Sequence, residues 1–139
     1  MQTYLVNLNK RALELILSGL IFSFLAVGLA SASSGGWTEK DYAIQGNWSV
    51  EQRGDEQVIT LSDNFSTKNG PDLKIFLSPM TIEEVTGKTA TEGSVLVSLL
   101  KSNEGSQEYV IPADVDLSKY KSILIHCEKY SVLWGGADL

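Results

Sequence analysis

The chain has 139 residues and a formal net charge of −6, with one cysteine and one histidine. Its length fits a single folded domain behind a targeting segment. The acidity argues against binding to nucleic acid or to an anionic bilayer surface, because both require clustered lysine and arginine side chains. We therefore expect no nucleic-acid partner.

The first 32 residues have the pattern of an export signal. Lys10 and Arg11 precede an uncharged, mostly apolar run from Leu15 to Ala30, and Ala30-Ser31-Ala32 offers the small residues that a signal peptidase accepts. The run also approaches the roughly 17–25 residues of a spanning helix, so residues 12–30 are alternatively an uncleaved membrane anchor. In both cases the folded part is exported to a periplasmic or extracellular space. Contact with the membrane is expected only through this segment.

Beyond a lead-in at residues 33–45, short apolar runs alternate with turn residues, which is typical of β-strands. Residues 94–100 fit a strand or a short helix, and residues 122–134 fit two antiparallel strands or one long bent strand. Thr81 fits the cap of a single helical turn. The pattern predicts an all-β fold, an antiparallel β-sandwich or jelly-roll-like single domain over residues 46–139. The other expected strands cover 48–50, 57–61, 73–77 and 107–112.

Cys127 is the single thiol of an exported domain, where cysteines are normally paired. The residues alone leave three roles open: a buried packing residue, a metal or cofactor ligand, or a redox-active thiol. His126 would point to the opposite face of an extended strand, so it does not form a catalytic pair with Cys127 or chelate the same ion unless a bulge turns the chain. A metal site is therefore not expected. The covalent haem signature Cys-x-x-Cys-His is absent, so any haem would be held non-covalently.

The aromatic residues allow two interpretations. Trp48, Tyr109, Tyr130 and Trp134 would line a cleft for a flat ligand, or they would fill the core, as large aromatic residues do in small domains. Tyr130 and Trp134 alternate onto one face of the last strand, which Gly135-Gly136 is expected to end. The sequence offers no acid–base or nucleophile set for an enzyme. That favours a binding or adhesion module.

Three sequence blocks resemble the signatures of the DM-thirteen domain family, in the family's order. They are Ser62–Ser78, the pair Gly105–Pro112 and Asp116–Tyr120, and the pair Ser122–Cys127 and Tyr130–Leu139. The resemblance covers roughly residues 46–139. The family is labelled "electron transfer" and occurs beside DOMON domains. It implies a β-rich domain whose hallmark cysteine matches Cys127, with a role in redox chemistry or in holding a haem-like group.

The resemblance makes Cys127 the candidate redox thiol or cofactor ligand of an exported accessory electron-transfer module. Its candidate pocket neighbours are His126, Tyr109, Tyr130 and Trp134. The family often has an aromatic residue where this chain has His126. The expected partner is a redox or envelope protein. The alternative function is a non-enzymatic binding or adhesion β-sandwich in which Cys127 is a buried core residue.

Overall fold

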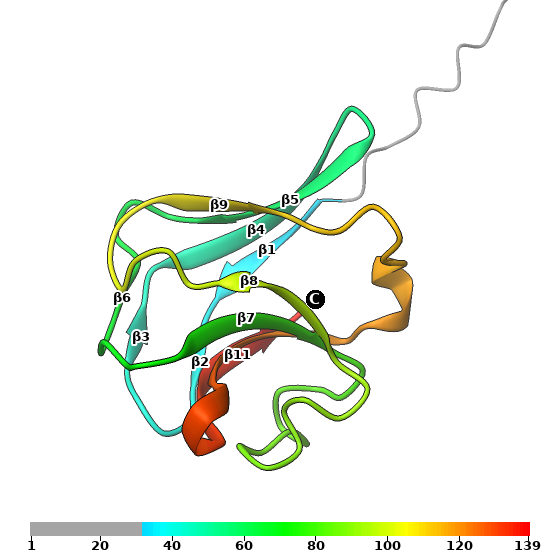
Figure 1. Cartoon of the computed structure of the whole chain (residues 1–139). Coiled ribbons are helices and arrows are strands. Elements are labelled where there is room, and N and C mark those ends of the chain that lie inside the picture. The colour runs from blue at the N-terminus through cyan, green and yellow to red at the C-terminus, as the bar shows by residue number, and fades with distance from the viewer. Residues whose placement is uncertain (1–31) are drawn as a thin grey trace, which may run out of the picture.

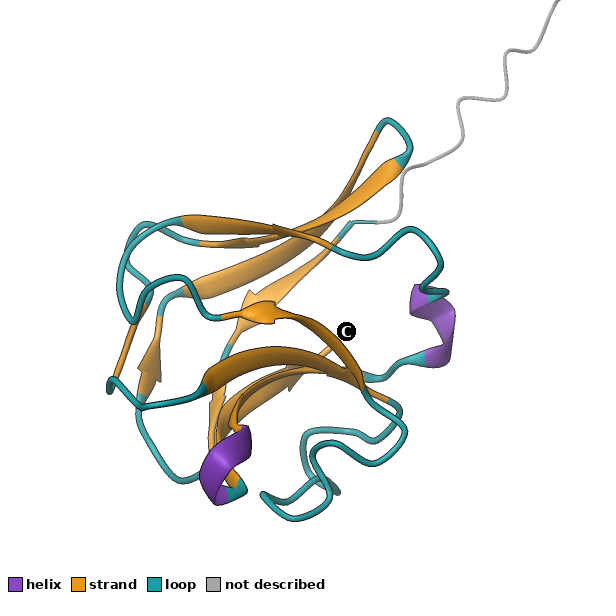
Figure 2. Cartoon of the chain, in the orientation of Figure 1, coloured by secondary structure: helices purple, strands orange, loops and turns teal. Residues whose placement is uncertain are grey.

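The computed structural model describes residues 32–139, so the predicted signal or anchor segment lies outside the described residues. The described part is all-β apart from two short 3-10 helices (Figure 2). Its elements in chain order are β1 (Ser33–Gly36), β2 (Thr38–Glu39), β3 (Ile44–Gln45), β4 (Asn47–Arg53), β5 (Glu56–Leu61), β6 (Ser66–Thr67), β7 (Leu73–Ser78), β8 (Val95–Leu99), β9 (Gln107–Val110), η1 (Leu117–Lys119), β10 (Ser122–Cys127), η2 (Glu128–Tyr130) and β11 (Val132–Asp138).

Two larger antiparallel sheets contain most of these strands. One has the order β1-β4-β5-β9 and the other the order β2-β11-β10-β7-β8, while β3 and β6 form a two-stranded sheet. Figure 1 shows β5 and β9 in one layer and β7 and β11 in another. The all-β, antiparallel character expected from the sequence is confirmed. No helix within residues 32–139 has the length and apolar character to cross a membrane.

Local sequence explains several boundaries. Arg53 pairs with Glu56 across the tight turn between β4 and β5, and Gly54 has a φ of 60° there. Hairpin turns of two residues need such positive φ angles, which glycine adopts without a steric penalty. Residues 94–100, whose sequence fits either a strand or a short helix, contain strand β8. Residues 122–134 lie in two antiparallel strands, β10 and β11, joined by η2.

The residues expected as a lead-in belong to the sheets. β1 pairs with β4, β2 pairs with the Gly135-Gly136 part of β11, and β3 pairs with β6. Gly135-Gly136 was expected to end the last strand, but β11 continues to Asp138. Residues 33–45 are therefore part of the folded domain, held by strand pairing.

The main hydrophobic core draws residues from both larger sheets. Ile123, Ile125 and Cys127 of the central strand β10 belong to it. The alternate residue Leu124 belongs to a second cluster, which the segment 79–94 covers with Ile82 and Val85. Because β10 is covered on both faces, all six of its residues are buried. Other members of the main core are Trp48, Val50, Ile59, Leu61, Leu73, Ile75, Leu77, Tyr109, Trp134 and Ala137.

Candidate functional site

Cys127 is the last residue of β10, and its side chain has no solvent exposure. It pairs with Leu73 of β7 on one side and with Val132 of β11 on the other. Its side chain belongs to the main core together with Ile125 and Trp134. A cysteine in such a setting packs as a small apolar residue, and its thiol is not reachable by reagents from solvent.

Hydrogen bonds and ion pairs hold the residues that follow Cys127 against the start of β7. The backbone amide of Lys129 donates to Asp72 Oδ2 at 3.0 Å, and the amide of Glu128 donates to the Asp72 carbonyl at 3.3 Å. Lys74 Nζ contacts Asp72 at 3.3 Å and also bonds the Glu128 carboxylate. Hydrogen bonding to Glu128 raises the pKa of Lys74. These contacts tie η2 to the start of β7 beside the buried sulfur.

His126 lies on the opposite face of β10 from Cys127. It is 1% exposed, its ring meets Phe76 edge-on at a centroid distance of 5.9 Å, and its Nδ1 has no hydrogen-bond partner. The irregularity between β10 and β11 leaves the Cys127–Leu73 register with β7 intact, so it does not bring the two side chains together. Burial lowers the pKa of His126, so the imidazole is neutral in the folded protein at pH 7.

This buried imidazole predicts a stability that depends on pH. Because the folded pKa of His126 lies below its unfolded value of about 6.5, the unfolded chain takes up the proton more readily. Stability is therefore fully present above about pH 6.5 and falls below it, by at most about 1.4 kcal/mol per pH unit for one proton. Urea unfolding of the wild type at pH 7.5, 6.5, 5.5 and 5.0 measures this loss.

The His126→Phe variant is the comparison for this experiment. It keeps an aromatic ring against Phe76 and removes the titrating group, so its stability is expected to vary much less between pH 6.5 and 5.0. Glu84 has a lowered pKa because it accepts hydrogen bonds from Thr81, so its contribution falls away only below about pH 4.5. An equal slope in wild type and variant would contradict the assignment to His126.

The four candidate pocket neighbours of Cys127 do not surround one pocket. Trp134 and Tyr109 are core residues, 5% and 3% exposed, whereas Tyr130 lies in η2 and is 61% exposed. The Trp134 Nε1 donates to the Lys68 carbonyl at 2.8 Å, and the Tyr109 hydroxyl accepts from the Lys101 amide at 2.8 Å. With His126 on the other face, the aromatic residues act mainly as core and not as the walls of a cleft.

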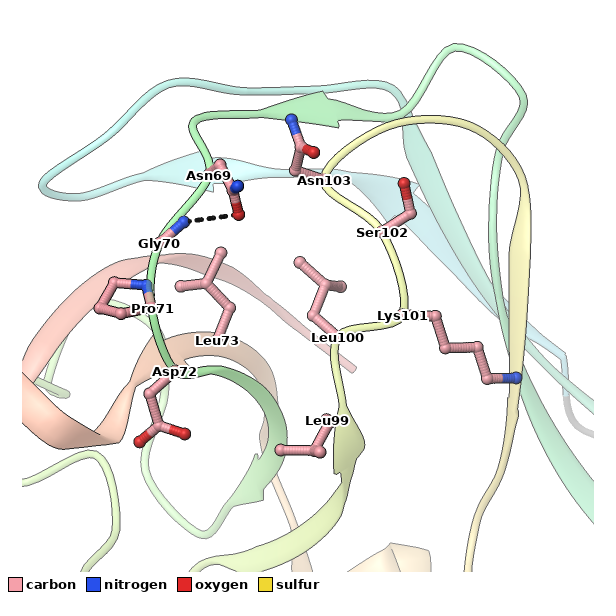
Figure 3. A pocket seen from close by; sticks show the side chains of 10 residues that line it. All are labelled: Asn69, Gly70, Pro71, Asp72, Leu73, Leu99, Leu100, Lys101, Ser102 and Asn103. Atoms are coloured by element: carbon pink, nitrogen blue, oxygen red, sulfur yellow. Dashed lines mark hydrogen bonds between the residues drawn. The ribbon is translucent and has the colours of Figure 1, made fainter.

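Two surface depressions lie elsewhere. One, of about 450 Å³, is bordered by residues 69–73 and 99–103 (Figure 3). The other, of about 320 Å³, lies beside β9 and is bordered by residues around Gln57 and Pro112. Neither is lined by Cys127, but Leu73 in the first is its cross-strand neighbour. Neither depression has a motif in the sequence, where the turn-rich stretches around Gly70 and Asn103 are the available signal.

The described residues do not fit a haem-like group on Cys127. A flat cofactor needs a cavity of several hundred Å³ that opens onto its ligand, and this sulfur is enclosed by the core. Across residues 32–139 no cluster of three or more His, Cys, Asp or Glu side chains could hold a metal ion. The geometry thus defines an all-β domain with an interior cysteine.

The family is shown by sequence comparison. A family model described as Electron transfer DM13 matches residues 37–139. The match covers most of the chain, so the protein belongs to this family, as the sequence blocks indicated. It begins near β2 rather than at residue 46, consistent with the pairing of the N-terminal strands. No curated protein and no solved structure matches the chain.

Proposed function

We propose that this exported domain is an accessory, non-enzymatic binding module of an electron-transfer system, in which Cys127 stabilises the core. The family description supports the electron-transfer context. The observation that carries the role is the complete burial of Cys127 among apolar side chains. The sharing of one core by the two larger sheets supports a β-sandwich, an architecture that presents its loops and edges to partners.

The burial matters because each redox role of a thiol requires access. In thiol–disulfide exchange the thiolate attacks a partner's disulfide sulfur, forms a mixed disulfide and releases the partner's other sulfur as a thiolate. That attack requires the two sulfurs to touch, and Cys127 has no exposed surface. A partner that binds the outside of the folded domain therefore meets loops and strand edges, and not the thiol.

A redox function is the second candidate, favoured by the way η2 is attached. The segment is held to β7 partly by the Lys74–Glu128 and Lys74–Asp72 ion pairs, whose carboxylates are partly exposed. Ion pairs of this kind contribute little to stability. Local opening of η2 would expose Cys127 to a partner's disulfide while the sheets remained paired.

Reaction with the aromatic disulfide reagent 5,5′-dithiobis(2-nitrobenzoate) separates the two functions. If Cys127 is a core residue, it is expected to react at least about 1,000-fold more slowly in native buffer than in denaturant, since labelling must await global unfolding. The rate should then rise with urea in parallel with the unfolding equilibrium. Absorbance of the released thiolate measures it.

The matched variant is Glu128→Gln, which weakens the contact of η2 with Lys74. The core role predicts the same native labelling rate for the variant and the wild type, after correction for any change in global stability. Rapid native labelling that depends weakly on urea and accelerates in Glu128→Gln would overturn the core role and support the redox function.

A further inference from the structure

One sheet edge in the described part differs from the others. The edge strands of the two larger sheets are β1, β9, β2 and β8. β1 is Ser-Ser-Gly-Gly, β2 has two residues, and β9 carries Glu108 and is followed closely by Pro112. Short length, charge and proline are the devices by which proteins protect edge strands from pairing with other chains. β8 reads Val-Leu-Val-Ser-Leu and has no charge or proline.

The side chains of β8 are correspondingly exposed. Leu96 is 45% and Leu99 is 60% exposed, and they pair in register with Phe76 and Lys74 of β7. Those partners alternate onto the outer face of the sheet, where Phe76 joins the second apolar cluster. Leu96 and Leu99 therefore extend this apolar face beyond the segment that covers it. An irregularity at Val97 shortens the regular part of the edge without adding polarity.

The backbone of β8 also has an unpaired side. The Leu100 amide donates to the Leu73 carbonyl at 2.9 Å. Because antiparallel hydrogen bonding alternates along a strand, the amide and carbonyl of the preceding residue, Leu99, point away from β7. The 450 Å³ depression lies between the chain that enters β7 and the chain that leaves β8, and Leu73 and Leu100 point into it, while Leu99 stands at its border (Figure 3). The free backbone groups of Leu99 thus face away from this recess, so a strand added at β8 meets the backbone edge and not the recess.

Charge distinguishes the possible occupants. Lys10, Arg11 and Glu14 together contribute +1 to the formal −6 of the whole chain, so residues 33–139 carry −7, and two copies repel each other. Beside Leu99, Lys74 is shared by the carboxylates of Asp72 and Glu128, which leaves that group with a formal charge of −1. Lys101 borders the depression but extends away from it, with Nζ 4.8 Å from the centre of the Tyr109 ring (Figure 3). A basic occupant is favoured over a second copy.

We propose that the β8 edge binds an extended segment of a partner protein that carries apolar and basic residues on one face, at every second position, and adds to the sheet as a further strand. Main-chain hydrogen bonds along β8 supply affinity, and apolar side chains packed over Leu96 and Leu99 supply specificity. The basic side chains face the acidic group around Lys74. This site rests on the proposed binding function and identifies the surface that performs it.

The test uses two synthetic peptides and the full-length protein labelled with nitrogen-15. A seven-residue peptide with valine and lysine on the same face and threonine on the other, Val-Thr-Lys-Thr-Val-Thr-Lys, is expected to bind saturably and to shift the amide signals of residues 95–103. Its counterpart with glutamate in place of lysine should bind at least about 10-fold more weakly, because like charges oppose docking. The dissociation constants come from the chemical-shift titrations.

Leu99→Lys and Val110→Lys form the matched pair of variants. Both add one positive charge at an exposed position, Leu99 on β8 and Val110, 52% exposed, on the edge strand β9. Leu99→Lys is expected to weaken the valine–lysine peptide at least about 10-fold, and Val110→Lys less than about 3-fold. Sedimentation of the unbound wild type should show a monomer.

Each contrary result has a distinct meaning. No binding, shifts confined to β9, or equal effects of the two variants would overturn the β8 site. A wild-type dimer that Leu99→Lys dissociates would replace the partner segment with a second copy. The proposed binding function is tested separately by Cys127 labelling, so rapid native labelling together with peptide binding at β8 would overturn the core role of Cys127 while this edge site stands.

Discussion

Replacing Trp134 by alanine is expected to lower the free energy of unfolding by about 3–5 kcal/mol, the usual cost of removing a large buried aromatic side chain. The side chain is 5% exposed, and the centroid of its ring lies 4.1 Å from the centroid of the Tyr42 ring. Its Nε1 also donates a hydrogen bond to the Lys68 carbonyl at 2.8 Å. The variant therefore leaves a cavity in the core and releases the segment that leads into β7. Guanidinium unfolding followed by circular dichroism measures the loss.

Two tryptophan-to-phenylalanine variants separate packing from hydrogen bonding. Trp134→Phe keeps most of the buried surface but leaves the Lys68 carbonyl without its donor, at an expected cost of about 1–3 kcal/mol. Trp37 has a buried Nε1 with no hydrogen-bond partner, so Trp37→Phe removes an unsatisfied group and should cost less than about 1 kcal/mol. Equal losses in the two variants would show that the indole bond to Lys68 does not stabilise the domain.

The sequence predicted the central part of this core well. Apolar residues on both faces indicated a covered central strand, and β10 is buried throughout. Alternation placed Ile125 and Cys127 on one face and His126 on the other, and the clusters agree with that placement. Such predictions succeed because side-chain direction in an extended strand has a period of two, whatever the strand pairs with.

Tyr130 lies where the period-two alternation of side chains does not hold. It was expected to share a strand face with Trp134, but it lies in η2 and is exposed. Ser131 turns the chain there with a φ of 53°. A glycine at this position would have predicted such a positive φ, but a serine does not. Trp134 is moreover an extra residue in the β10–β11 pairing, between Leu133 and Gly135, which interrupts the alternation. Neither the turn nor the irregularity has a local sequence signal.

The pairing of distant segments could not be predicted from the sequence, for a different reason. The strands at residues 33–45 are two to four residues long and contain mostly polar residues and glycine, so they have little pattern of their own. They are strands because β4, β6 and β11 offer unpaired edges. The depression beside β8 likewise arises from two loops about 30 residues apart along the chain. Both features depend on tertiary packing.

Gly136→Ala is the second change expected to have a large effect, a loss of about 3 kcal/mol in the free energy of unfolding. A Cβ atom at this position would lie 2.5 Å from the Ile123 carbonyl oxygen and 2.7 Å from Ile82 Cδ1. The first contact is with the backbone of β10, so relief requires the two central strands to move apart. The second lies in the cluster over the outer face, so relief there displaces the segment 79–94 that covers Leu124.

Gly36→Ala is the matched control, because it makes the same change in another strand. A Cβ atom there meets only Asn47 Oδ1, at 3.9 Å, so the variant should change stability by less than about 1 kcal/mol. Urea unfolding of both variants and the wild type gives the comparison. If Gly136→Ala is tolerated as well as Gly36→Ala, then β10 and β11 do not depend on close backbone approach. If only Gly136→Ala is destabilised, then Gly135-Gly136, which was expected to end the strand, allows β11 to pack closely against β2, β10 and the segment 79–94.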